Sequence, residues 1–169
     1  MRDQQHHSHG ERHDDHDHDK ATIRRDKGNA MTITGKQFMD LLPGKGGVPQ
    51  APDELYLCLP WKFVIEWERQ WKSWLYKYDI IYSKKFDCNK YASLYKSLPQ
   101  IIMPRTNGRA QSLAIAEIWY KPAAGRGAHA VNVYVNTAGK LHWREPQPPC
   151  SEIRPTPQEQ RSVFCRILG

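Results

Sequence analysis

The spacing of apolar residues predicts helices in the first half of the chain. Residues 34–42 open with the capping-box pair Thr34 and Gln37 and end before Pro43. Residues 61–78 place their apolar side chains on one stripe, a pattern typical of an amphipathic helix: Val64, Trp67, Trp71, Trp74 and Leu75. Such an aromatic stripe favours a place in the core over a role as a ligand platform.

A third helix is predicted to follow Asp87, a good N-cap residue, and to stop before Pro99. Its apolar face is formed by Tyr91, Leu94, Tyr95 and Leu98. Cys88 then lies in the first helical turn, where unpaired N–H groups and the helix dipole favour the thiolate. Cys88 can therefore be interpreted in two ways, as a catalytic nucleophile or as a buried structural cysteine.

The second half of the chain has the pattern of strands. Strand character is found at 55–59, 113–120, 128–135, 140–146 and 163–168, with a helical turn at 158–162. Helices followed by antiparallel strands predict an α+β fold, with the cysteine helix packed on a small antiparallel sheet.

The loop Thr137-Ala138-Gly139 sets the register of the predicted hairpin, because glycine in third place favours a type I turn with a G1 bulge. In this register Val131 lies opposite Glu145, and His129 lies opposite Gln147. His129 and Glu145 become diagonal neighbours on the buried face, with Cβ atoms roughly 7 Å apart. The two side chains are long enough to form a hydrogen bond with each other across that distance.

These residues form a candidate catalytic site. Cysteine hydrolases need a thiol at a helix start, an imidazole on a strand and a polar group that orients the imidazole. Cys88, His129 and Glu145 fit these roles, and the amide of Gln147 is a candidate oxyanion donor. The alternative is a His–Glu pair that stabilises the sheet, with Cys88 unrelated to it.

The net charge is +7, and residues 1–27 contribute −1, so the remainder is basic. Its Lys and Arg are scattered, which favours solubility over nucleic-acid binding. The apolar runs are too short for a membrane span, and the N-terminus lacks a hydrophobic signal core. We expect a soluble protein, cytoplasmic by default, with the host cytoplasm or a virion as other compartments and a homodimer as a possible state.

One domain and a tail are predicted: a disordered His/Asp-rich tail over residues 1–30, and a single cysteine hydrolase domain over 31–169. The tail holds weak candidate metal ligands at His6, His7, His9, His13, His16 and His18. The four cysteines lack the spacing of a zinc site. The sequence itself requires no cofactor.

Over about residues 86–147 the sequence resembles the papain-like C-terminal protease domain of the fairy-ring mushroom agglutinin family, which includes phage proteins described as lectin-like. The shared motifs are Phe-Asp-Cys before a Tyr-Ala helix, Ala-Ile-Ala-Glu-Ile-Trp, His-Ala-Val-Asn-Val and Glu-Pro-Gln. The resemblance implies a papain-like fold and a calcium-dependent cysteine peptidase acting on proteins or peptides. Cys88 would be its nucleophile, His129 its base and Glu145 the orienting group, with Gln147 as oxyanion donor.

The sequence departs from this family at two points. Asn89 and Lys90 stand where relatives often have acidic residues, so calcium rests on the resemblance alone. The β-trefoil lectin domain has no counterpart here, so the resemblance does not imply sugar binding. Two alternatives to a peptidase remain: a cell-wall amidase or endopeptidase of the NlpC/P60 or CHAP type, and a non-catalytic phage structural or binding protein that keeps the fold.

Overall fold

The computed structural model describes residues 24–25, 31–44, 51, 53–83, 86–102, 112–124 and 127–169. The six tail histidines proposed as weak metal ligands lie outside these residues. The division into a tail of residues 1–30 and a domain of 31–169 stays a prediction. Within that tail, Arg24–Arg25 form a short strand that pairs with Met31 and Thr32.

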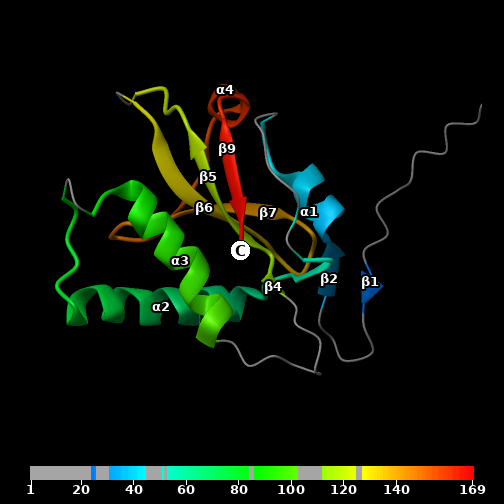
Figure 1. Cartoon of the computed structure of the whole chain (residues 1–169), viewed down its shortest axis with the longest axis horizontal. Coiled ribbons are helices and arrows are strands. Elements are labelled where there is room, and N and C mark those ends of the chain that lie inside the picture. The colour runs from blue at the N-terminus through cyan, green and yellow to red at the C-terminus, as the bar shows by residue number, and fades with distance from the viewer. Residues whose placement is uncertain are drawn as a thin grey trace, which may run out of the picture.

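The described chain has an α+β fold, in which three of the helices precede a run of five consecutive strands, β4 to β8 (Figure 1). The helices are α1 (Gly35–Leu41), α2 (Trp61–Lys77), α3 (Cys88–Ile102) and α4 (Pro157–Arg161). The strands are β1 (Arg24–Arg25), β2 (Met31–Thr34), β3 (Leu55–Leu57), β4 (Ser112–Leu113), β5 (Ile115–Tyr120), β6 (His129–Val135), β7 (Leu141–Glu145), β8 (Ser151–Ile153) and β9 (Cys165–Leu168).

The strands form two sheets. One has the order β8-β7-β6-β5-β9 and is antiparallel throughout. The other has the order β1-β2-β3-β4, and β3 pairs with β4 in parallel. In Figure 1, α3 lies across the five-stranded sheet and α2 crosses beneath it, while α1 and β2 lie on the other side.

Each face of the five-stranded sheet covers its own part of the core. Val131, Val133 and Trp143 pack with α1 and β2. On the other face, Tyr134 packs with Trp71 of α2 and with side chains of α3. Both faces of β6 are therefore buried, whereas the sequence predicted burial only for the face that carries His129.

The aromatic stripe of α2 is a core element, as predicted. Trp67 is 6% exposed and Trp71 is fully buried, in edge-on contact with Tyr95 of α3. The capping box of α1 is also present, because the Thr34 hydroxyl accepts from the Gln37 N–H and the Gln37 side chain accepts from the Thr34 N–H. The apolar stripe of α2 and the capping box of α1 are thus both determined by residues within each helix or next to it.

The predicted end of α3 was wrong, because the helix continues through Pro99 to Ile102. Proline removes one backbone donor, but the last helical turn can still form when contacts with another segment stabilise it. Gln100 makes these contacts. Its side chain accepts a hydrogen bond from the Leu113 N–H at 2.7 Å and donates one to the Leu113 carbonyl at 3.2 Å. The last turn of α3 is thereby tied to β4.

The hairpin register is confirmed. Val133 pairs with Trp143 and Val135 with Leu141, in the register that the turn predicted. Gly139 has φ of 73°, the left-handed conformation that the bulge requires. The segment predicted as one strand over 113–120 is instead two, because the chain passes from the small sheet to the large one at Ala114.

No helix within the described residues is both long enough and apolar enough to cross a bilayer.

Candidate functional site

His129 and Glu145 meet at the open end of β6 and β7, as the register predicts. The His129 Nε2 atom lies 2.6 Å from Glu145 Oε2, and their side chains are 25% and 19% exposed. The other carboxylate oxygen accepts from the Gln147 backbone N–H at 3.0 Å. Glu145 therefore fixes the orientation of the imidazole and the start of the loop after β7.

The imidazole lies in an aromatic corner of the sheet. The His129 ring is 6.0 Å from the ring of Tyr120, and Tyr120 is 5.6 Å from Trp143, both in edge-on geometry. Tyr120 and Trp143 belong to the core shared with α1 and β2. Burial raises the pKa of Tyr120 to about 12, so this hydroxyl stays protonated at physiological pH.

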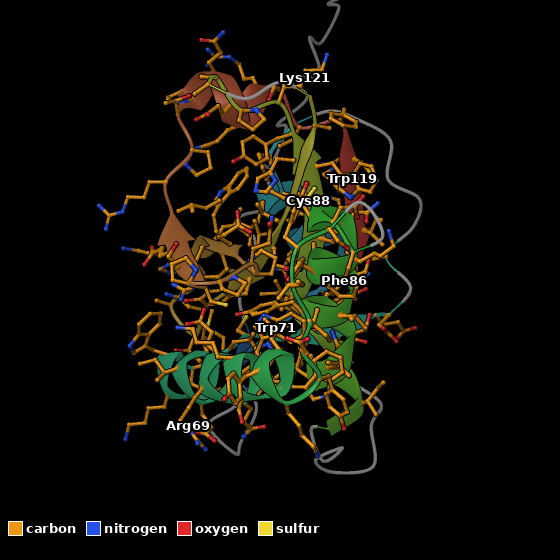
Figure 2. All side chains as sticks on the ribbon, turned by 90° about the vertical axis from the view of Figure 1, so that its left-hand side faces the viewer. Arg69, Trp71, Phe86, Cys88, Trp119 and Lys121 are labelled. Atoms are coloured by element: carbon orange, nitrogen blue, oxygen red, sulfur yellow. The ribbon has the colours of Figure 1, made fainter. Side chains whose placement is uncertain are left out.

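Cys88 is the first residue of α3 and is partly buried. It lies at the end of the helix farther from α2 (Figure 2). The helix packs on the sheet face that carries Asn132, whose amide donates to the Ala92 carbonyl at 3.0 Å. Within the described part of the chain, the His129 ring is hydrogen-bonded to Glu145, and no hydrogen bond joins it to the Cys88 thiol. The structure thus brings His129, Glu145 and the Gln147 backbone together but does not link them to Cys88 in this way.

Two of the other cysteines, Cys58 and Cys150, are more buried than Cys88, whereas Cys165 is partly buried like it. Cys58 is 1% exposed and Cys150 is 6% exposed, and burial raises the pKa of each thiol to about 11. All four cysteines are free.

We expect iodoacetamide at pH 8 to label Cys88 well before Cys58 and Cys150 in the folded protein. A thiol with a pKa of about 11 instead of 9.0 has about 100-fold less thiolate at that pH, and burial slows access further. Mass spectrometry of the digested protein measures the order of labelling, and labelling in urea is the control. Equal native rates for Cys58 and Cys88 would contradict the burial described above.

A surface hollow lies beside the C-terminal end of α2, and sequence reasoning missed it. Its volume is about 590 Å³, and its lining includes Lys72, Leu75, Tyr76, Asp79, Ile80 and Pro148. Tyr76 is 90% exposed. The available signal was a run of tyrosines at 76, 78 and 82, where the amphipathic stripe of the helix ends.

The resemblance implies a calcium ion, but the described residues contain no cluster of side chains that could bind it. No group of three or more His, Cys, Asp or Glu side chains there could hold a metal ion. Next to Cys88, the Asp87 carboxylate lies 3.4 Å from the Lys90 ammonium. The buried carboxylate of Glu117 accepts from Ser93 Oγ and Trp119 Nε1, at 2.7 Å each. Asp87 and Glu117 are already paired within the protein, so among the described residues they do not form a calcium site.

No protein-family model matches the sequence, and none of the curated proteins matches it significantly. Solved structures do share the fold. One is described as a PSL1a–E64 complex, with a TM-score of 0.58, 18% identity, and coverage of 80% of this chain and 50% of that chain. Another is a Polyporus squamosus lectin bound to the human-type influenza-binding epitope Neu5Acα2-6Galβ1-4GlcNAc, with a TM-score of 0.55, 18% identity, and coverage of 80% and 49%.

These neighbours correct the prediction of an enzyme. The sequence was expected to encode a cysteine peptidase acting on a protein or peptide, but a solved structure that shares its fold is described as a Polyporus squamosus lectin. The protease part of the family resemblance is unsupported, whereas its lectin-like part agrees with the neighbours. The chain spans about half the length of each neighbour. It therefore has the fold of about one half of a Polyporus squamosus lectin chain.

Proposed function

We propose that this chain is a non-catalytic, lectin-like binding protein whose ligand is a carbohydrate. The observation that carries the proposal is the fold shared over 80% of the chain with a Polyporus squamosus lectin, together with the sugar epitope named in the description of that structure. Of the functions predicted from sequence, this agrees with a binding protein that keeps the fold.

In this proposal His129, Glu145 and Gln147 have a positioning role. The carboxylate of Glu145 is shared between the His129 ring and the Gln147 backbone, so it joins the end of β7 to the start of β6. Partly buried polar groups that satisfy one another define a local conformation. The loop after β7, which forms one wall of the surface hollow, starts from this pair.

The first test is carbohydrate binding without turnover. The full chain should bind an immobilised oligosaccharide from a panel of neutral and sialylated glycans, measured by biolayer interferometry. The Cys88→Ala variant should bind with an unchanged Kd, because the thiol has no part in a binding function. Release of product from a peptide or peptidoglycan substrate, lost in Cys88→Ala, would overturn the proposal.

The second test compares the pH dependence of Cys88 alkylation in the wild type and in His129→Ala. The two curves should have the same shape, because the imidazole is hydrogen-bonded to Glu145 and no hydrogen bond links it to the thiol. Mass spectrometry of the labelled peptide gives the rates. An inflection that the His129→Ala substitution removes would show a working thiol–imidazole couple, and would contradict the non-catalytic assignment.

A further inference from the structure

We propose that the hollow at the end of α2 is the sugar site, and that it binds one uncharged hexopyranose ring. This inference rests on the proposed function and adds a location and a ligand class to it. The volume of about 590 Å³ falls within the range of roughly 300–1,000 Å³ found for small-molecule pockets. One ring with part of its neighbour fits such a space.

The hollow offers an apolar platform of the kind that sugar rings use. Tyr76 is 90% exposed, and the neighbouring Ile81 is 69% exposed. Ile80, which follows α2, adds apolar surface, whereas Leu75 lines the hollow but is only 3% exposed. A pyranose has one face made largely of C–H groups, and burying that face against a tyrosine ring removes apolar surface of both from water.

Polar groups of both kinds lie at the rim. The Asp79 carboxylate accepts hydrogen bonds and the Lys72 ammonium donates them, which matches the hydroxyl groups of a sugar. Within the described residues, neither side chain has a hydrogen bond or an ion pair with another. Both are therefore available to a ligand without breaking a contact inside the protein.

The charges of the hollow favour a neutral ligand. Lys72 and Lys77 contribute two positive charges, and Asp79 contributes one negative charge. The C-terminal end of α2 adds a partial negative charge of about half a unit. These contributions sum to only about +0.5, so the hollow offers a weak net attraction to an acidic sugar.

The walls of the hollow are fixed before any ligand arrives. The Ile80 N–H donates to the Leu75 carbonyl at 2.9 Å, which closes the helix end, and the Tyr91 hydroxyl donates to the Ile80 carbonyl at 3.2 Å. The opposite wall at Pro148 is held because Trp71 Nε1 donates to the Pro146 carbonyl at 2.8 Å. A site held in this way loses little conformational freedom on binding.

Asp79 occupies a position that suits glycine better. Its φ is 50°, in the left-handed region, at the place where helices usually end with glycine. An aspartate there costs roughly 1 kcal/mol relative to glycine. Backbone geometry alone would favour glycine here, and a role of the carboxylate in ligand binding would explain the aspartate.

The test measures binding of neutral disaccharides, lactose and diacetylchitobiose, and of a sialylated lactosamine to the full chain. Tyr76→Ala should weaken binding of the preferred neutral sugar at least tenfold. Asp79→Asn tolerates the same backbone conformation and should also weaken binding at least tenfold. Tyr82→Ala is the matched control, because Tyr82 is 63% exposed but does not line the hollow. The Kd of this variant for the sugar should equal that of the wild type.

Asp79→Gly separates function from structure. This variant should melt at a higher temperature than the wild type and still lose binding, an outcome that a purely structural aspartate would not produce. Wild-type binding that survives Tyr76→Ala and Asp79→Asn would overturn the site while leaving the proposed function intact. Stronger binding of the sialylated glycan that depends on Lys72 would overturn the neutral ligand. Failure to bind any sugar would overturn the proposed function and the site together.

Discussion

Replacing Glu68 by alanine is expected to lower the free energy of unfolding by about 3–5 kcal/mol, the usual cost of breaking a buried ion pair from one side. Glu68 of α2 is 8% exposed and Arg144 of β7 is 5% exposed. Arg144 Nε donates to Glu68 Oε1 at 2.6 Å, and a second guanidinium nitrogen contacts the same oxygen. The Tyr95 hydroxyl of α3 donates to it at 3.2 Å. Removing the carboxylate leaves a buried cation and a buried hydroxyl without this partner.

Urea unfolding followed by tryptophan fluorescence measures this cost. Glu68→Leu combined with Arg144→Met is the matched comparison, because it replaces both charges by apolar groups of similar size. The double variant should regain most of the stability lost in Glu68→Ala. Glu66→Ala is the surface control on the same helix, since Glu66 pairs with the exposed Arg69, and its effect should stay below about 1 kcal/mol. A similar loss for both single variants would contradict the buried network.

Replacing Trp71 by alanine is the second large effect, with an expected loss of about 3–5 kcal/mol. The ring is fully buried and contacts the rings of Trp67, Tyr91 and Tyr95. Figure 2 shows it on the side of α2 that faces α3. Truncation removes these contacts and leaves a cavity where two helices and the loop after β7 meet.

Trp71→Phe distinguishes packing from the hydrogen bond. Phenylalanine keeps an aromatic ring but cannot donate to the Pro146 carbonyl, so the expected loss is about 1–2 kcal/mol. Because that bond holds the Pro148 wall of the hollow, the phenylalanine variant should also bind sugar more weakly while remaining folded. Thermal unfolding and the binding assay on the same samples measure both effects. Unchanged binding in a folded Trp71→Phe variant would show that the wall does not depend on this bond.

Local patterns predicted the elements whose chemistry is contained in a few neighbouring residues. The capping box of α1, the stripe of α2 and the turn at Gly139 each specify geometry within one segment. The pairing of His129 with Glu145 followed from the turn and from the alternation of side chains, which together carry the register along both strands. These parts could be predicted because no distant contact had to be known.

Other features depend on contacts between distant segments. The extension of α3 past Pro99 depends on Gln100 meeting Leu113, which no local pattern reveals. The four-stranded sheet was missed because β1, β3 and β4 have only two or three residues each. The buried role of Glu68 was hidden as well, because a glutamate on an amphipathic helix resembles a solvated one. The hollow went unnoticed because its wall at Pro148 comes from a segment about 70 residues beyond Asp79.

The parallel pairing of β3 with β4 has a consequence for the order of folding. Tyr56 lies opposite Ser112, so the chain between them contains both α2 and α3 and must loop back before these strands can meet. Closing so long a loop costs entropy that the pairing of a two-residue strand does not offset on its own. The hairpin of β6 and β7, with its short turn, forms without that cost. We therefore expect β4 to join β3 late in folding, after the helices and the hairpin have formed.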